Sequence, residues 1–107
     1  MHRIFVCHAN AIGEGTAIKV DTPHLAVAVF NVSGKFYAVS DRCSHGNASM
    51  SEGYIEEDGT VECPLHAARF CLKSGQALCQ PATEPLQTFS VFVQDEDIYV
   101  DVPEANQ

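Results

Sequence analysis

Basic side chains are scarce in this chain, where six Lys and Arg residues stand against 14 Asp and Glu residues, for a formal net charge of −8. A surface that binds nucleic-acid phosphates needs clustered Lys and Arg, so this composition argues against nucleic acid as a partner. The acidity is concentrated in residues 84–107, which hold six acidic residues and no basic one. It is either a solvated face that keeps the protein in solution or a docking surface for a basic protein partner.

Long apolar runs are also missing. The longest, residues 25–30, is far shorter than the roughly 20 residues that a transmembrane helix needs, so we expect no membrane association. Residues 1–5 lack the charged start, apolar stretch and cleavage site of a secretory signal, so a cytoplasmic location is expected. In a reducing compartment the five cysteines are more often metal ligands or buried thiols than disulfides.

No stretch shows a sustained helical period with capping residues, whereas β-branched and aromatic residues gather in short runs between turn signals. The strands expected from these runs are residues 16–20, 25–31, 35–39, 61–63, 70–72, 89–93 and 98–102. The turns expected between them are Ser33-Gly34, Asp58-Gly59, Ser74-Gly75 and Asp95-Glu96. The pattern predicts a single all-β domain over residues 1–107.

Two of these turns also predict which residues face each other. With hairpin tips at residues 58–59 and 74–75, the expected cross-strand pairs are Tyr54 with Cys63, Phe70 with Cys79, and Ala68 with Pro81. Three loops would then meet at one end of the molecule, namely residues 43–50, 63–69 and 80–83. This register depends on the length of each turn, because a slip of one residue changes every pair.

The cysteines and histidines form two short motifs. Cys43-Ser44-His45 is followed, after seventeen residues, by Cys63-Pro64-Leu65-His66. One thiolate and one imidazole from each loop match the Rieske arrangement of a 2Fe-2S cluster, in which two histidines replace two cysteines on one iron. A Cys2His2 zinc site is the alternative, although such sites usually group two cysteines and then two histidines. The motifs therefore favour one 2Fe-2S cluster over a zinc-stapled interaction module.

Two segments around these motifs resemble known proteins. They are DRCSHGNASMSEG (residues 41–53) and VECPLHAARF (residues 61–70), and the resemblance extends over nearly the whole chain. The chain resembles the Rieske ferredoxins that serve bacterial aromatic ring-hydroxylating dioxygenases, most of all those of 3-phenylpropionate/cinnamate dioxygenase systems. The resemblance implies the Rieske fold, with an antiparallel β-sandwich as its basal part and a cluster-binding subdomain at about residues 41–83. It implies that the cluster ligands are Cys43, His45, Cys63 and His66.

The resemblance also implies a function. In this family an NADH-dependent flavoprotein reductase supplies electrons, the ferredoxin carries them one at a time, and a terminal Rieske oxygenase performs the chemistry. We therefore expect electron transfer and not catalysis, transient docking to both partners, and a monomer. Two alternatives stay open from the sequence: a small Rieske subunit of a nitrite reductase, and the zinc-stapled interaction module.

Several positions differ from the high-potential Rieske proteins of respiratory complexes. Those proteins carry a disulfide between the two loops and a Ser and a Tyr that donate hydrogen bonds to sulfur. The matching positions here are Ala48, Leu65, Ala68 and Phe70. Fewer donors to sulfur imply a reduction potential near the low end of the Rieske range, around −150 mV. Gly46 and Gly53 are expected to serve the backbone conformation of the first cluster loop.

Overall fold

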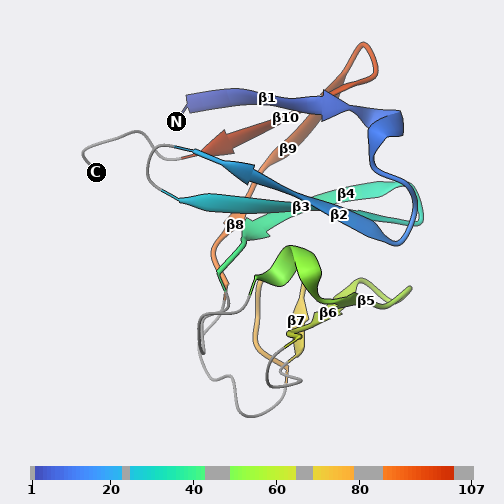
Figure 1. Cartoon of the computed structure of the whole chain (residues 1–107), viewed down its shortest axis with the longest axis vertical. Helices are drawn as coiled ribbons and strands as arrows, with labels where there is room; N and C mark the ends of the chain where they lie inside the picture. Colours follow the sequence, from blue (N-terminus) through green and yellow to red (C-terminus); the bar gives the residue numbers. More distant parts are fainter. Residues whose placement is uncertain (1, 23–24, 43–48, 65–68, 79–85, 103–107) are drawn as a thin grey trace.

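The computed structural model describes residues 2–22, 25–42, 49–64, 69–78 and 86–102, and these residues are almost entirely β (Figure 1). The strands are β1 (His2–His8), β2 (Thr16–Asp21), β3 (Ala26–Val32), β4 (Lys35–Ser40), β5 (Tyr54–Ile55), β6 (Thr60–Glu62), β7 (Arg69–Cys71), β8 (Thr88–Phe89), β9 (Val91–Gln94) and β10 (Asp97–Val102). Two single 3₁₀ turns, η1 (Ala9–Ala11) and η2 (Met50–Glu52), accompany them. The all-β prediction is confirmed.

The strands form three antiparallel sheets in the described part of the chain. Two larger sheets, with strand orders β1-β10-β9 and β2-β3-β4-β8, make a sandwich, and the small sheet β5-β6-β7 lies beside it with η2 (Figure 1). We call the two larger sheets the basal sandwich, and residues 49–64 and 69–78 the small-sheet region. Within the described residues, no helix is long and apolar enough to cross a membrane.

Strand β3 is the centre of the molecule, because both of its faces are covered. Val27 and Val29 belong to a buried cluster with Ile98 and Val100 of the other large sheet. Ala28, Phe30 and Val32 alternate with them and belong to a second buried cluster, which also contains Val61, Phe70 and Leu72 of the small-sheet region. Burial on both faces explains why the longest apolar run of the chain falls in this strand.

Two of the four predicted turns have the expected form. Ser33-Gly34 and Asp95-Glu96 each join strands through a two-residue loop with positive φ at both positions, at 52° and 89° and at 54° and 68°. Such primed turns match the twist of the flanking strands, although positive φ is unfavourable for residues other than glycine.

The hairpin between β5 and β6 differs from the prediction by one residue. The Glu56 N–H donates to the Thr60 carbonyl, so the loop holds residues 57–59 and not two residues. Gly59 closes it at φ 88°, as in three-residue hairpins with a left-handed last position. Tyr54 therefore faces Glu62, and the predicted pairing with Cys63 is wrong.

The hairpin after β7 differs by two residues. The Cys71 N–H donates to the Gln76 carbonyl, which leaves a four-residue loop at 72–75. Phe70 consequently pairs with Ala77, and the predicted pairing with Cys79 is wrong. The predicted pair of Ala68 with Pro81 lies outside the described residues.

Candidate metal centre

Of the predicted ligands, Cys63 is described by the structure, whereas Cys43, His45 and His66 lie outside the described residues. Cys63 follows β6 directly, is a free thiol and has 1% of its surface exposed. It belongs to the buried cluster that contains Val61 and Phe70. A buried free cysteine supplies the soft thiolate donor that an iron–sulfur or zinc site requires.

The segment that carries Cys43 and His45 is closed at its base by backbone contacts. Arg42 and Ser49 form an antiparallel bridge on either side of residues 43–48. The Met50 N–H donates to the Asp41 carbonyl over 2.6 Å. The two ends of this ligand-bearing segment therefore lie side by side.

The Asp41 side chain adds a second closure at the same place. It is 4% exposed, and its two oxygens accept hydrogen bonds from the Ser49 hydroxyl at 2.5 Å and the Ser51 N–H at 2.8 Å. Sequence reasoning missed Asp41. The available signal was an acidic residue two positions before the first ligand with two serines shortly after it, but burial of the carboxylate cannot be seen from that pattern.

The segment that carries Cys63 and His66 is closed by a strand pair. Glu62 of β6 and Arg69 of β7 face each other across residues 63–68. The Arg69 Nε lies 3.6 Å from Glu62 Oε1, and the Arg69 carbonyl accepts a hydrogen bond from the Leu78 N–H at 2.8 Å. This base is a continuous ladder, unlike the single bridge of the first segment.

Gly53 lies against the backbone of Glu62, the residue before Cys63. A Cβ atom at this position would lie 2.4 Å from the Glu62 carbonyl oxygen and 3.1 Å from that of Met50, closer than Cβ atoms come to backbone. Its φ of −76° is one that any residue adopts, so close backbone approach, and not an unusual dihedral angle, is the reason for glycine. Gly46 lies outside the described residues. The chain leaving the first segment thus contacts the residue immediately before Cys63.

The third predicted loop, residues 80–83, lies outside the described residues, but the chain that follows it is anchored. The Leu86 N–H donates to the Gly75 carbonyl at 2.7 Å. Gly75 has φ 77°, and a Cβ there would lie 2.2 Å from the Leu86 carbonyl oxygen. A close approach and a positive φ both require glycine at this position.

Two further cysteines, Cys7 and Cys71, are described; both are free thiols, but they are partly buried and not fully buried as expected. Burial, and secondarily the charge of Asp97, raise the pKa of the Cys7 thiol. Hydrogen bonding to the side chain and backbone of Ser74 lowers the pKa of the Cys71 thiol. Among the described residues, no three His, Cys, Asp or Glu side chains gather as a metal site.

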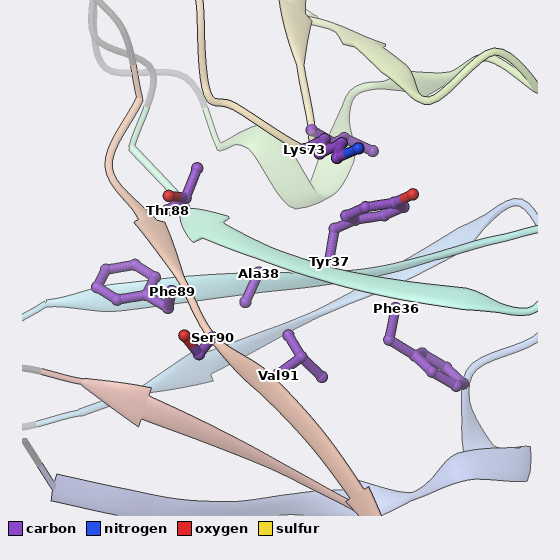
Figure 2. A pocket seen from close by; sticks show the side chains of 9 residues that line it. Phe36, Tyr37, Ala38, Lys73, Thr88, Phe89, Ser90 and Val91 are labelled. Carbon is purple, nitrogen blue, oxygen red and sulfur yellow. The ribbon is translucent and has the colours of Figure 1, made fainter.

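A cavity of about 300 Å³ lies away from the ligand-bearing segments (Figure 2). It opens between β4 and the segment that leaves β8, with the Lys73 side chain above Tyr37 and Thr88 in the view. Its lining consists of residues 36–38, 72–73 and 88–91. This lining contains no His, Asp, Glu or Cys, so it offers neither paired carboxylates nor a thiol–imidazole pair for catalysis.

The model of the Rieske [2Fe-2S] domain matches residues 2–90 of the chain. The chain belongs to the Rieske family. It is 61% identical, over 105 residues and 98% of each chain, to the 3-phenylpropionate/cinnamic acid dioxygenase ferredoxin subunit of Shigella flexneri. The Rieske protein is therefore an electron-transfer component and not a catalytic subunit.

Solved structures give the same family. A chain of the complex of reduced oxygenase and oxidized ferredoxin in carbazole 1,9a-dioxygenase is 36% identical, with a TM-score of 0.88 and coverage of 92% of this chain and 91% of that chain. The ferredoxin of carbazole 1,9a-dioxygenase from Nocardioides aromaticivorans is 27% identical, with a TM-score of 0.88 and coverage of 94% and 97%. The Rieske fold predicted from the sequence is confirmed, and the protein is an iron–sulfur electron carrier.

Proposed function

We propose that this Rieske protein carries one electron at a time from an NADH-dependent flavoprotein reductase to the terminal oxygenase of an aromatic-ring dioxygenase. It would hold a single [2Fe-2S] cluster through Cys43, His45, Cys63 and His66. The structural observation that supports this best is the contact between Gly53 and Glu62. Gly53 lies shortly after the first proposed ligand pair, and Glu62 lies directly before the second. We further propose one domain over residues 1–107, with residues 41–83 as the cluster-binding subdomain.

The ligand set fits the cofactor chemically. When bound, a Rieske cluster supplies one-electron redox chemistry, with two thiolates on one iron and two imidazoles on the other. On the side of the protein, Cys63 is withdrawn from water in an apolar cluster, and Glu62 and Arg69 close the base of its segment. The same part of the chain offers no disulfide that would compete for Cys63, since the thiol is free.

The proposed partners follow from two supporting observations. The curated relative of 61% identity is a dioxygenase ferredoxin subunit, and a structural relative is a chain of an oxygenase–ferredoxin complex. The net charge of −8 favours docking to basic partner surfaces, and salt should weaken this docking. A carrier must release each partner, so we propose a cytoplasmic monomer that docks transiently. The aromatic substrate belongs to the oxygenase.

Metal analysis and spectroscopy of the purified protein test the cofactor. We expect two irons and two acid-labile sulfides per chain, and a rhombic electron paramagnetic resonance signal after reduction. Stoichiometric zinc in a colourless protein would contradict the proposal and support the interaction module instead. Co-purification with a large reductase would support the nitrite-reductase alternative, because a ferredoxin is expected to purify alone.

Electron transfer reconstituted with a reductase and an oxygenase tests the partners. We expect NADH-dependent reduction, followed by reoxidation when oxygenase and aromatic substrate are present. The rate should fall as ionic strength rises, because exposed charges are screened over about 10 Å at 0.1 M salt. A rate independent of salt would show that the acidic residues are only a solvated face.

A further inference from the structure

Asp41 is the only charged side chain that is fully buried among the described residues, with 4% of its surface exposed. Burying a carboxylate is costly unless hydrogen bonds replace the water that it loses. Asp41 recovers two such bonds, from the Ser49 hydroxyl at 2.5 Å and from the Ser51 N–H at 2.8 Å. The Ser49 and Ser51 hydroxyls are also hydrogen-bonded to each other at 2.9 Å.

The hydrogen bonds of Asp41 join parts of the chain that lie on either side of residues 43–48. Asp41 follows β4, and its own N–H donates to the Ala26 carbonyl of β3 at 2.9 Å, so it is fixed to the basal sandwich. Its two donors lie beyond residues 43–48, where the chain enters η2. The carboxylate therefore ties the exit of this segment to its entrance.

The two ligand-bearing segments differ in how their bases are closed. Residues 63–68 connect β6 to β7, two paired strands of one sheet. The Glu62–Arg69 pair is the last of a ladder that begins at Thr60. Among the residues that the structure describes, one isolated bridge, between Arg42 and Ser49, closes the base of residues 43–48. At this base the Asp41 side chain adds two hydrogen bonds to the backbone contact between the Met50 N–H and the Asp41 carbonyl.

We propose that Asp41 is a positioning residue of the metal centre, which ties Ser49 and Ser51 to the end of β4 and so supports metal binding by the proposed ligands Cys43 and His45. The inference rests on the proposed function insofar as these two residues are ligands. Groups behind the ligands set ligand orientation and metal retention, and their removal typically weakens metal binding tenfold or more. Asp41 acts through the loop and does not contact the reacting atoms.

The test is the rate at which a chelator removes iron from the purified holoprotein. This rate is measured as the loss of visible absorbance. Asp41→Ala removes both acceptors, and we expect iron release about tenfold faster or more. Asp41→Asn keeps one oxygen for the Ser51 N–H and an amide that can donate to the Ser49 hydroxyl. We expect it to rescue most of the loss, with release within about threefold of the parent rate.

Asp58 offers a matched control in the small-sheet region. It also accepts one backbone and one hydroxyl hydrogen bond, from the Thr60 N–H at 3.1 Å and the Thr60 hydroxyl at 2.7 Å, but it spans the β5–β6 turn instead of a ligand-bearing segment. Asp58→Ala should release iron at the parent rate. The electron paramagnetic resonance g-values should change in Asp41→Ala and stay unchanged in Asp58→Ala.

Equal release rates and g-values for Asp41→Ala, Asp58→Ala and the parent, all with full clusters, would overturn the role of Asp41. If Asp41→Ala does not fold, Ser49→Ala decides, since it removes one of the two bonds: faster release than in Asp58→Ala supports the role, and equal release overturns it. A parent protein that holds zinc would overturn the proposed function instead, and zinc release from the same variants would still measure the role of Asp41.

Discussion

The basal sandwich and the small-sheet region differ in strand length and in the contacts that hold the chain in place. In the basal sandwich, β2, β3, β4 and β10 have six or seven residues each, and apolar side chains fill the space between the two sheets. In the small-sheet region, β5, β6 and β7 have two or three residues each. Its chain is held by the Asp41 and Glu62–Arg69 contacts and by the close approach at Gly53. Apolar burial stabilises both regions, and polar contacts, a glycine contact and the proposed cluster are added in the second.

The two regions nevertheless share one buried cluster. Phe30 and Val39 of the four-stranded sheet pack in the same cluster as Val61, Phe70 and the thiol of Cys63. Electron-transfer proteins gain from a rigid metal environment, because groups around a metal centre then keep their positions when its charge changes. The shared cluster attaches the small-sheet region to the rigid part of the molecule.

Removal of a ligand should separate the two regions most strongly. Cys63→Ser is expected to abolish iron binding, and metal binding is also folding free energy for a site held by short strands. Amide hydrogen exchange should then show loss of protection in β5–β7 and retained protection in β2–β4 and β10. Cys7→Ser, in the basal sandwich, should keep full iron. A full cluster in Cys63→Ser would show that the ligand assignment is wrong.

Truncation of the two fully buried phenylalanines should also distinguish the regions. Phe30→Ala and Phe70→Ala each remove a side chain with no exposed surface, and such changes cost about 3–5 kcal/mol of unfolding free energy. Phe30→Ala should lower the stability of the whole domain, because β3 serves both clusters. Phe70→Ala should open mainly the small-sheet region.

Denaturant unfolding followed by far-ultraviolet circular dichroism and by visible absorbance separates these outcomes. For Phe70→Ala, the visible transition should come at lower denaturant than the circular dichroism transition. The control is Phe92→Ala, whose side chain is 36% exposed on β9. Coincident transitions in Phe70→Ala would mean that the two regions unfold as one unit.

Two glycines allow the same comparison at the level of the backbone. Gly53→Ala places a methyl group 2.4 Å from the Glu62 carbonyl oxygen, so β6 must move, at a cost of about 1–3 kcal/mol and with faster iron loss. Gly34→Ala, in the β3–β4 turn, meets no atom within 4 Å but must adopt φ 89°. It should cost about 1–2 kcal/mol with unchanged iron loss.

Thermal unfolding and chelator-driven iron loss measure these two effects separately. Similar losses of melting temperature with different rates of iron loss are expected. If Gly53→Ala keeps the parent rate of iron loss, the close approach of Gly53 to Glu62 does not control cluster retention.

Sequence patterns predicted the hairpin turns of the basal sandwich better than those of the small-sheet region, although the predicted strands did not include β1 and joined β8 and β9 in one run. The runs at residues 25–31 and 35–39 are long enough for burial to outweigh local choices, and β3 and β4 were found within one residue of them. The β5–β6 register was wrong because Gly59 closes a three-residue loop, and sequence alone does not distinguish it from a two-residue turn. β5 was missed because two residues carry no periodicity.

The candidate site was predictable only in its chemistry. The types and spacing of the ligands are visible in the sequence, so Cys63 could be predicted as a ligand before its burial was known. The contacts around the proposed site depend on tertiary structure: Asp41 accepts hydrogen bonds from Ser49 and Ser51, and Gly53 is needed because the Glu62 backbone lies against it. Neither has a local sequence signature.

A smaller effect is expected on the reduction potential. Phe70 is fully buried in the same cluster as Cys63, so we expect the hydroxyl of Phe70→Tyr to lie near the proposed metal centre. A donor to sulfur stabilises the reduced state, and we expect a rise of about 59 mV, which is roughly 1.4 kcal/mol for a one-electron couple. Phe89→Tyr, in the basal cluster, is the control and should leave the potential unchanged.

Protein-film voltammetry of the two variants and the parent measures these potentials. An unchanged potential in Phe70→Tyr with an intact cluster would mean that lack of donors does not explain a low potential. Solvent exposure of the ligand-bearing segments would then be the factor to examine.

The smallest expected effect compares the Cys71 and Cys7 thiols, one from each region. Because hydrogen bonding to Ser74 lowers the pKa of Cys71, while burial and the Asp97 charge raise that of Cys7, Cys71 forms its thiolate at lower pH. The thiolate is the reactive species. Iodoacetamide should therefore modify Cys71 before Cys7 as pH rises from 7 toward 9. Peptide-resolved mass spectrometry of the treated holoprotein measures the extent of modification at each cysteine. Ser74→Ala should shift the Cys71 profile to higher pH and leave Cys7 unchanged; equal profiles for Cys71 in the parent and in Ser74→Ala would show that access, and not the hydrogen bond, controls its reactivity.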